Sequence, residues 1–186
     1  GIDNNWPPFE FRDNQDQISG IASGFVEQIK KRLAINLNLV EEMPWKATFE
    51  ALKNNEIDVL TMVTPSKERA KTMLFTKPYI SFPAVLVTRL DAPYASSIKD
   101  FQNKKVAVGD GYITHEALTK DYPEVTPVPV ANVTEALKAV NDGKADAALI
   151  NLAAFTYETS RLNITGLKVA APTEYSYNLA MAVRKD

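Results

Sequence analysis

Apolar and polar positions along the first third of the chain change between helical and strand periods. Apolar residues recur at helical spacing at Phe25, Ile29 and Leu33, whereas a compact, β-branched run over 57–63 is typical of a buried strand. From these patterns we expect a helix through 25–33, a half-buried strand over 35–40, a helix that begins near Met43 with Phe49 and Leu52 on its inner face, and a strand over 57–63. Strands and helices in this alternation predict a mostly parallel sheet with helices on both faces.

The pattern restarts after Asp91-Ala92-Pro93, which ends a strand over 82–89. We expect further strands at 104–109, 125–130, 145–150, 167–171 and 178–184, and helices at 114–121, 132–140 and 151–161. The second of these helices begins with Asn132 followed by Glu135, the spacing of a capping box.

A weak internal repeat favours two similar α/β lobes. Glu-Ala-Leu-Lys precedes an Asp-headed strand twice, with Asp58 and with Asp146. The strands near 84–89 and 178–184 are then expected to cross between the lobes as a two-strand hinge. We therefore assign residues 1–88 plus 178–186 to lobe 1 and residues 89–177 to lobe 2.

Composition excludes several classes of function. The 186 residues are 45% hydrophobic and 24% charged, with a formal net charge of -2 and no basic run, so we expect no nucleic-acid partner. No apolar segment approaches the roughly 20 residues of a membrane span. There is no cysteine, which excludes disulfides and thiolate metal sites.

Catalysis finds little support in the sequence. His115 is the single histidine, which excludes a histidine metal cluster or a triad, and we interpret it as a surface helix residue. Glu10, Asp110 and Glu116 are isolated carboxylates, and no phosphate loop is present. We therefore expect a binding domain, not an enzyme, with no catalytic residue, metal or cofactor.

One turn combines groups suited to an anion. The strand over 57–63 ends at Thr64-Pro65, Ser66 is placed to cap a following helix, and Arg69 comes one turn later. Backbone N–H groups at a helix start, next to a guanidinium, form a good carboxylate clamp. The alternative is a solvated helix face, because charged residues flank Arg69 on both sides.

The pattern Asp58…Thr64-x-Ser66-x-Glu68-Arg69…Phe75-x-x-Pro78-Tyr79 resembles the core motif of the type II periplasmic solute-binding proteins of the amino-acid type, family 3. The resemblance extends over nearly the whole chain. It implies an α/β fold, the bilobal Venus flytrap, in which two α/β lobes are joined by two crossing strands. In that family the arginine holds the ligand's α-carboxylate, which implies that Arg69, with Thr64 and Ser66, holds the anionic end of a ligand.

The resemblance also implies the rest of a ligand site. Trp6, Phe9 and Tyr79 match apolar cleft walls, although Trp6 and Phe9 also fit an edge segment anchored by aromatics. The turn at Gly111, Tyr112 and Thr114 matches the second lobe's helix start, where we expect Thr114 to cap the helix and Tyr112 replaces the family's small hydroxyl residue. Asn151 replaces an Asp that pairs with the ligand's ammonium, and its alternative or additional role is to cap the next helix. Trp45 is expected in the core.

The sequence segments W-P-P-F-E-F and F-T-x-P-Y-x-S-F-P are most similar to those of Venus flytrap sensor domains of membrane-bound hybrid histidine kinases. This implies an extracytoplasmic sensor that captures a small carboxylate-bearing solute and signals by hinge closure to a membrane-anchored module of the same chain. The alternatives are a free periplasmic amino-acid-binding protein that serves an ABC permease and, more remotely, a dehydratase-like enzyme. Family members carry a strand before the position of Gly1 and helices after Arg184, so we expect a domain of a longer chain.

Overall fold

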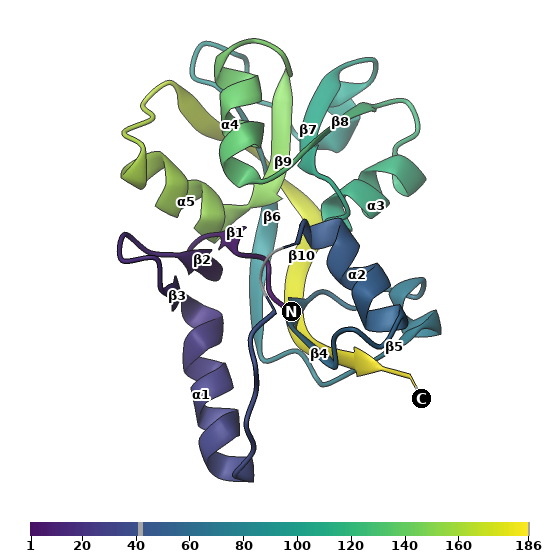
Figure 1. The fold of residues 1–186 in the computed structure, drawn as a ribbon. Coiled ribbons are helices and arrows are strands. Elements are labelled where there is room, and N and C mark those ends of the chain that lie inside the picture. The colour runs from purple at the N-terminus through teal and green to yellow at the C-terminus, as the bar shows by residue number, and fades with distance from the viewer. Residues whose placement is uncertain (41–42, 186) are drawn as a thin grey trace. The chain divides into compact units, whose positions relative to one another are not determined.

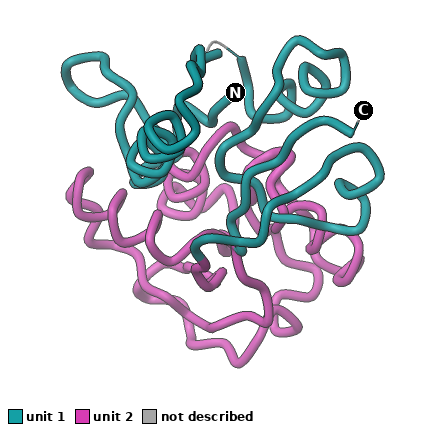
Figure 2. Tube along the Cα trace, turned by 90° about the horizontal axis from the view of Figure 1, so that it is seen from below, with its two compact units in different colours: residues 1–80, 178–186 teal, residues 81–177 magenta. Residues whose placement is uncertain are grey.

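The computed structural model describes residues 1–40 and 43–185 (Figure 1). The chain forms two compact units, unit 1 of Gly1–Ile80 with Asn178–Asp186 and unit 2 of Ser81–Tyr177 (Figure 2). The chain passes between them within β6 (Ile80–Arg89) and β10 (Leu167–Arg184). Residues 81–88, which we expected in lobe 1, belong to unit 2 because β6 is a strand of the unit 2 sheet.

In the part of unit 1 that the structure describes, the strands form two small sheets, accompanied by two α-helices and one 3₁₀ helix. The first sheet has the order β1-β2-β3 and is antiparallel. In the second, both β4 and β5 pair antiparallel with β10, with Val63 opposite Ala180 and Phe75 opposite Ala182. The elements are β1 (Asn5–Trp6), β2 (Glu10–Arg12), β3 (Ile18–Ser19), α1 (Ile21–Leu33), α2 (Trp45–Lys53), β4 (Val59–Val63), the 3₁₀ helix η1 (Arg69–Lys71) and β5 (Met73–Phe75).

The core of unit 1 lies between α2 and the β4–β10–β5 strands. Its buried members are Ala51, Leu52, Ile57, Leu60, Val63, Met73 and Ala182. Trp45 and Phe49 pack against this cluster, which confirms the core position predicted for Trp45 and the inner face predicted for α2. Burial of these side chains is the main source of stability for this unit.

Two expectations for unit 1 are wrong. Residues 35–40 form no strand, and Ile35 and Leu39 are 41% and 48% exposed. The helix over 25–33 is present as α1, but Leu33 is 65% exposed and Phe25 lies at the surface. The described strands of unit 1 pair antiparallel, not parallel. Alternation in a sequence identifies which residues can form a strand, but a strand also needs a neighbour for its backbone hydrogen bonds.

Unit 2 is built on a mixed sheet with the order β10-β6-β9-β7-β8. β7 is parallel to both β8 and β9, whereas β6 is antiparallel to β9 and places Ala84 opposite Asn151. The 167–171 and 178–184 strands that we expected are one continuous strand, β10. The other elements are the 3₁₀ helix η2 (Ile98–Phe101), β7 (Lys105–Gly109), α3 (Ile113–Asp121), β8 (Thr126–Val130), α4 (Val133–Asn141), β9 (Ala147–Asn151) and α5 (Leu152–Arg161).

A buried carboxylate links the two helices α4 and α5. Glu158 on α5 is fully buried, and its Oε2 accepts hydrogen bonds from the Thr134 hydroxyl at 3.0 Å and from Nη2 of Arg161 at 2.7 Å. At the start of α4 the predicted cap is confirmed, since Oδ1 of Asn132 accepts from the backbone N–H of Glu135 at 3.0 Å. The Thr134–Glu158 hydrogen bond thus connects α4 to α5, and the Arg161–Glu158 pair lies within α5.

Candidate functional site

Arg69 follows the turn after β4 but does not begin a long helix. The predicted hydroxyl contact is present, because Oγ of Ser66 accepts from the backbone N–H of Arg69 at 3.2 Å. The helix itself is η1, three residues long, and the chain then enters β5. We expected a helix start with free N–H groups and a helix dipole, and this expectation is wrong. A single 3₁₀ turn has too few aligned peptide groups to provide either.

The side chain of Arg69 is buried and oriented within unit 1. It is 7% exposed, whereas the side chain of Lys71, two residues later, is 67% exposed and pairs with Glu68. One guanidinium N–H, on Nη1, donates to the carbonyl oxygen of Thr64 at 3.0 Å, and the guanidinium carbon lies 4.8 Å from the centre of the Phe49 ring. The solvated-face alternative is thus wrong for Arg69. A buried guanidinium fixed on two sides is well suited to a bidentate anion contact.

Thr64 adds a second polar group to the same turn. Its side chain is buried, and its Oγ1 makes no hydrogen bond to any group in the part of the chain that the structure describes. Leaving a buried hydroxyl unsatisfied costs about 1–3 kcal/mol. A ligand oxygen at this position removes that cost, which is consistent with the ligand role predicted for Thr64.

The three predicted aromatic residues of unit 1 are largely enclosed. Trp6 and Phe9 are buried with ring centres 4.4 Å apart, and the backbone N–H of Phe9 donates to the carbonyl of Trp6 at 2.9 Å. Gly20 lets the chain approach this pair, since a Cβ there would lie 2.2 Å from the Phe9 carbonyl oxygen. This packing fits the interpretation of Trp6 and Phe9 as aromatic anchors of an edge segment. Their role as apolar walls of a ligand cleft stays a prediction.

Tyr79 is held by its hydroxyl group. The phenol donates to the carbonyl oxygen of Thr61 at 2.5 Å, and its ring packs 4.5 Å from the ring of Phe25. Burial, together with the nearby Glu10 carboxylate, raises the pKa of Tyr79. The phenol is therefore a neutral group fixed to the middle of β4.

The turn from Gly109 to Thr114 carries the first part of the predicted site in unit 2. Gly111 has a φ of +76°, a backbone conformation that glycine adopts without strain. Gly109 makes room for the buried Tyr112, because a Cβ on Gly109 would lie 2.6 Å from the tyrosine ring. This close contact fixes the turn that precedes α3.

Thr114 does not cap α3, and that prediction is wrong. Tyr112 holds the N-cap position without a side-chain hydrogen bond, so Thr114 lies inside the first turn. Its hydroxyl lies 3.0 Å from the hydroxyl of Tyr177, and both side chains are buried. His115 is partly buried, not a surface residue, with its Nδ1 3.4 Å from Asp110.

Asn151 ends β9 and caps α5, which confirms the capping interpretation. The residue is 0% exposed, and its Oδ1 accepts from the backbone N–H groups of Ala153 at 2.8 Å and of Ala154 at 3.4 Å. Its Nδ2 is buried and makes no hydrogen bond to any residue that the structure describes. The side chain therefore has one occupied acceptor and one unused pair of donors.

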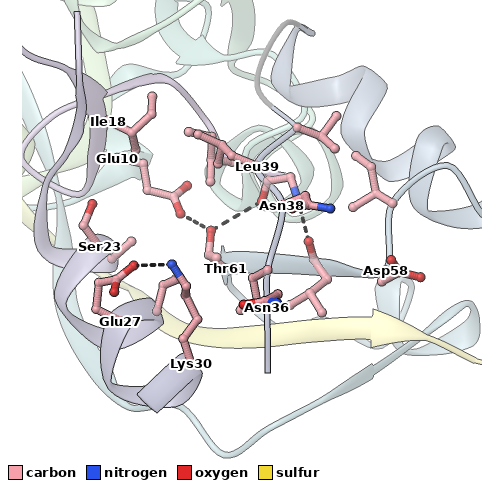
Figure 3. Close-up of a pocket in the computed structure, with 18 of the residues that line it drawn as sticks. Glu10, Ile18, Ser23, Glu27, Lys30, Asn36, Asn38, Leu39, Asp58 and Thr61 are labelled. Carbon is pink, nitrogen blue, oxygen red and sulfur yellow. Dashed lines mark hydrogen bonds and ion pairs between the residues drawn. The ribbon is translucent and has the colours of Figure 1, made fainter. Parts of the chain in front are cut away.

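Unit 1 also contains a pocket that sequence reasoning missed. It has a volume of about 530 Å³ and lies between α1, residues 36–40 and β4, with Glu10, Ser23, Asn36, Asn38, Leu39 and Thr61 among its lining residues (Figure 3). None of the ten residues predicted for the ligand site lines it. The volume falls in the range of small-molecule sites, but the groups suited to an anion lie elsewhere.

Glu10 is the ionisable group buried in the pocket wall. Its Oε2 accepts from the backbone N–H of Asp3 at 2.9 Å. Its Oε1 accepts from the Thr61 hydroxyl, as Figure 3 shows. Burial raises the pKa of Glu10 to about 7, against the opposing effect of these two hydrogen bonds. The sequence signal was a single carboxylate between two phenylalanines, Phe9 and Phe11, in a short strand.

Two other kinds of site have no counterpart in the described residues. Among them, no cluster of three or more His, Asp or Glu side chains is arranged to hold a metal ion. Within the same ranges, 1–40 and 43–185, no helix is both long enough and apolar enough to cross a membrane.

Comparison with known proteins decides the family. The sequence matches the bacterial extracellular solute-binding proteins, family 3, over residues 1–186. The chain belongs to this family. The fold is the α/β, Venus flytrap type of the periplasmic binding proteins.

Individual relatives of this family 3 protein include both sensors and binding proteins. The virulence sensor protein BvgS of Bordetella bronchiseptica is 23% identical over 168 residues, covering 90% of this chain and 14% of the sensor. The L-cystine-binding protein TcyJ of Escherichia coli is 28% identical over 153 residues, covering 81% of this chain and 57% of that protein. The chain thus spans between a seventh and somewhat over half of these relatives.

A solved structure supports the same grouping. A histidine kinase sensor domain with similarity to periplasmic binding proteins is 26% identical and superposes with a TM-score of 0.94, covering 100% of this chain and 81% of that domain. The family resemblance therefore extends to sensor proteins as well as to solute-binding proteins.

Proposed function

We propose that this chain is the extracytoplasmic ligand-binding domain of a membrane-bound sensor, and that it captures a small carboxylate-bearing solute. The signal that we propose is hinge closure on ligand binding. The domain acts in the periplasm, and its partner is a kinase module anchored in the membrane as part of the same protein. Trp6, Phe9 and Tyr79 are proposed as apolar contacts of the ligand, and Gly111, Tyr112, Thr114 and Asn151 as further ligand contacts.

The observation that carries this proposal is the arrangement of Arg69. Its guanidinium is held by the Thr64 carbonyl and the Phe49 ring, and the unused Thr64 hydroxyl belongs to the same turn. A carboxylate bound here gains charge-assisted hydrogen bonds from the guanidinium and a further one from the hydroxyl.

The sensor role is supported by two comparisons. The BvgS relative is a sensor that is far longer than this chain, and the histidine kinase sensor domain matches the whole chain at a TM-score of 0.94. The second candidate is a free binding protein that delivers an amino acid to an ABC permease, and the similarity to TcyJ favours it. The full-length gene distinguishes the two, because a membrane span and kinase module mark the sensor, whereas a signal peptide and a stop codon mark the free protein.

The capture of a carboxylate is tested by thermal shift with amino acids, 2-oxo acids, dicarboxylates and aromatic acids. A ligand at 100 times its Kd stabilises the folded chain by about 2.7 kcal/mol, which corresponds to roughly 5–10 °C for a chain of this size. We expect Arg69→Ala to abolish the shift. Lys71→Ala is the matched control, because it removes a nearby cation that is exposed and paired with Glu68. An unchanged shift in Arg69→Ala contradicts the proposal.

A further inference from the structure

One ring nitrogen of His115 contacts two different groups within unit 2. The backbone N–H of Gly111 donates to Nδ1 of His115, with the two nitrogens 3.5 Å apart. The same Nδ1 lies 3.4 Å from Oδ1 of Asp110. His115 belongs to the first turn of α3, and its two partners lie in the turn that joins β7 to α3. The three residues are therefore brought together by local structure alone.

The two contacts require different forms of the imidazole ring. A backbone N–H can only donate, so Gly111 needs an Nδ1 without a hydrogen, as in the neutral ring that carries its proton on Nε2. An ionised carboxylate can only accept, so Asp110 needs a hydrogen on Nδ1, and the imidazolium always has one there. One nitrogen cannot satisfy both partners at once. Protonation of the ring therefore excludes the hydrogen bond from Gly111.

The turn between β7 and α3 is held on both sides of this contact. The N–H of Asp110 donates to the carbonyl of Val130 on β8 at 2.8 Å, and the N–H of Tyr112 donates to the carbonyl of Gly109 at 3.0 Å. Between them, Gly111 has a φ of +76°, a conformation that glycine adopts without strain. A change of partner at His115 therefore acts on the peptide that joins Asp110 to Gly111 and is confined to residues 109–112.

The surroundings of α3 supply the other titratable groups near this turn. α3 packs against β7 and β8, and its residue Thr114 contacts Tyr177 of β10. β8 carries no titratable side chain. The titratable side chains of the other elements at this place are Lys105 of β7, Glu116, Lys120 and Asp121 of α3, and Glu174, Tyr175 and Tyr177 of β10. Tyr175 donates to Asp121 at the far end of α3, so Asp110 is the carboxylate that pairs with the ring.

We propose that His115 is a pH-dependent switch of residues 109–112. The neutral ring accepts a hydrogen bond from the Gly111 N–H, and the imidazolium instead donates one to the Asp110 carboxylate. The second bond is charge-assisted, which stabilises the acidic form of the turn. The switch lies wholly in unit 2 and does not depend on the ligand proposed for Arg69.

Nuclear magnetic resonance tests the switch directly, because His115 is the single histidine among the 186 residues. Spectra of the isotope-labelled chain are recorded from about pH 5 to 8, the range in which histidine ordinarily changes its charge. We expect the neutral ring to carry its proton on Nε2, and the Gly111 amide and Asp110 carboxylate resonances to shift in the same step as the ring. A neutral ring protonated on Nδ1 overturns the proposal, as does a Gly111 amide that stays in place while the ring titrates.

His115→Gln removes the titration but keeps a side chain that can accept from the Gly111 N–H or donate to Asp110. We expect the pH step of the Gly111 amide to disappear over the same range. Lys120→Gln is the matched control, because it changes an exposed charge on the same helix, and there the step should remain. A Gly111 step that persists in His115→Gln arises from another group and overturns the proposal. Circular dichroism establishes that both variants are folded before their spectra are compared.

Discussion

The carbonyl oxygen of Thr64 accepts a hydrogen bond from Nη1 of Arg69 at 3.0 Å, so the turn that ends β4 positions the guanidinium that follows it. Because the two residues are five positions apart, the contact is local in sequence. The Phe49 ring on α2 supports the other side of the guanidinium at 4.8 Å. The orientation of the cation thus depends on one strand end and one helix.

Phe49→Leu tests this support. Leucine keeps an apolar side chain against the unit 1 core but removes the aromatic face below the guanidinium. A cation–π contact contributes about 0.5–2 kcal/mol, depending on desolvation, so we expect carboxylate affinity to fall by roughly 3- to 30-fold. Calorimetric titration measures the change. An affinity equal to that of the wild type shows that Arg69 is oriented without the ring.

Glu10 gives the folded chain a dependence on pH with a defined sign. Its pKa is about 7 in the folded protein and 4.5 ordinarily, so between these values the folded state binds more protons than the unfolded state. The Glu10 contribution to the free energy of unfolding is greatest below pH 4.5 and decreases as the pH rises to 7. The loss over this window is about 3 kcal/mol. Thermal melts across roughly this pH range measure it.

Glu10→Gln isolates this contribution from those of other groups. Glutamine can accept from the Asp3 N–H and donate to the Thr61 hydroxyl, so it imitates the protonated acid. We expect the variant to lose less stability than the wild type between pH 4.5 and 7. Glu50→Gln changes an exposed carboxylate paired with Lys53 and serves as the control. Equal pH slopes in Glu10→Gln and the wild type contradict the assignment.

The hydroxyl pair Thr114–Tyr177 is expected to stabilise unit 2. The two oxygens lie 3.0 Å apart and both side chains are buried. Thr114→Val and Tyr177→Phe each remove one partner at nearly constant volume, and each is expected to lower the free energy of unfolding by about 1–2 kcal/mol. In a double-mutant cycle the two effects should couple by roughly 1 kcal/mol. Strict additivity, measured by urea denaturation, rules out a shared hydrogen bond.

Arg161→Ala removes the cationic partner of the buried Glu158. The pair is 2.7 Å apart, with the carboxylate fully buried and the guanidinium about half exposed. Loss of one partner leaves a buried charge, so we expect the free energy of unfolding to fall by about 2 kcal/mol. Arg12→Ala breaks an exposed pair with Asp16 and should change stability by less than about 1 kcal/mol. Similar losses in the two variants contradict the importance of the Arg161–Glu158 pair within α5.

Local signals in the sequence predicted much of the fold. The β-branched run at 57–63 is β4, the Asn132 and Asn151 caps are present, and Trp45 packs against the core. Each of these depends on residues within a few positions of one another or on burial of one large side chain. The family motif then singled out Arg69. The spacing of residues alone did not decide whether its side chain is buried or lies on a solvated helix face.

The errors arise where the partner of a segment decides its structure. Residues 35–40 alternate like a strand but have no pairing strand among the described residues, and η1 stops after three residues because the chain must enter β5. Thr114 is a residue type that often caps a helix, yet its hydroxyl pairs with Tyr177, far along the sequence. The burial of Glu10 results from α1 and β4 together, which no local pattern records.

The two ends of the Asn151 amide have a consequence for how this protein can evolve. One end begins α5, and few residues do this well: asparagine, aspartate, serine and threonine, with glycine close behind. A substitution outside this set costs helix stability. Substitutions at this position that keep the start of α5 intact are therefore confined to about five amino acids out of roughly twenty.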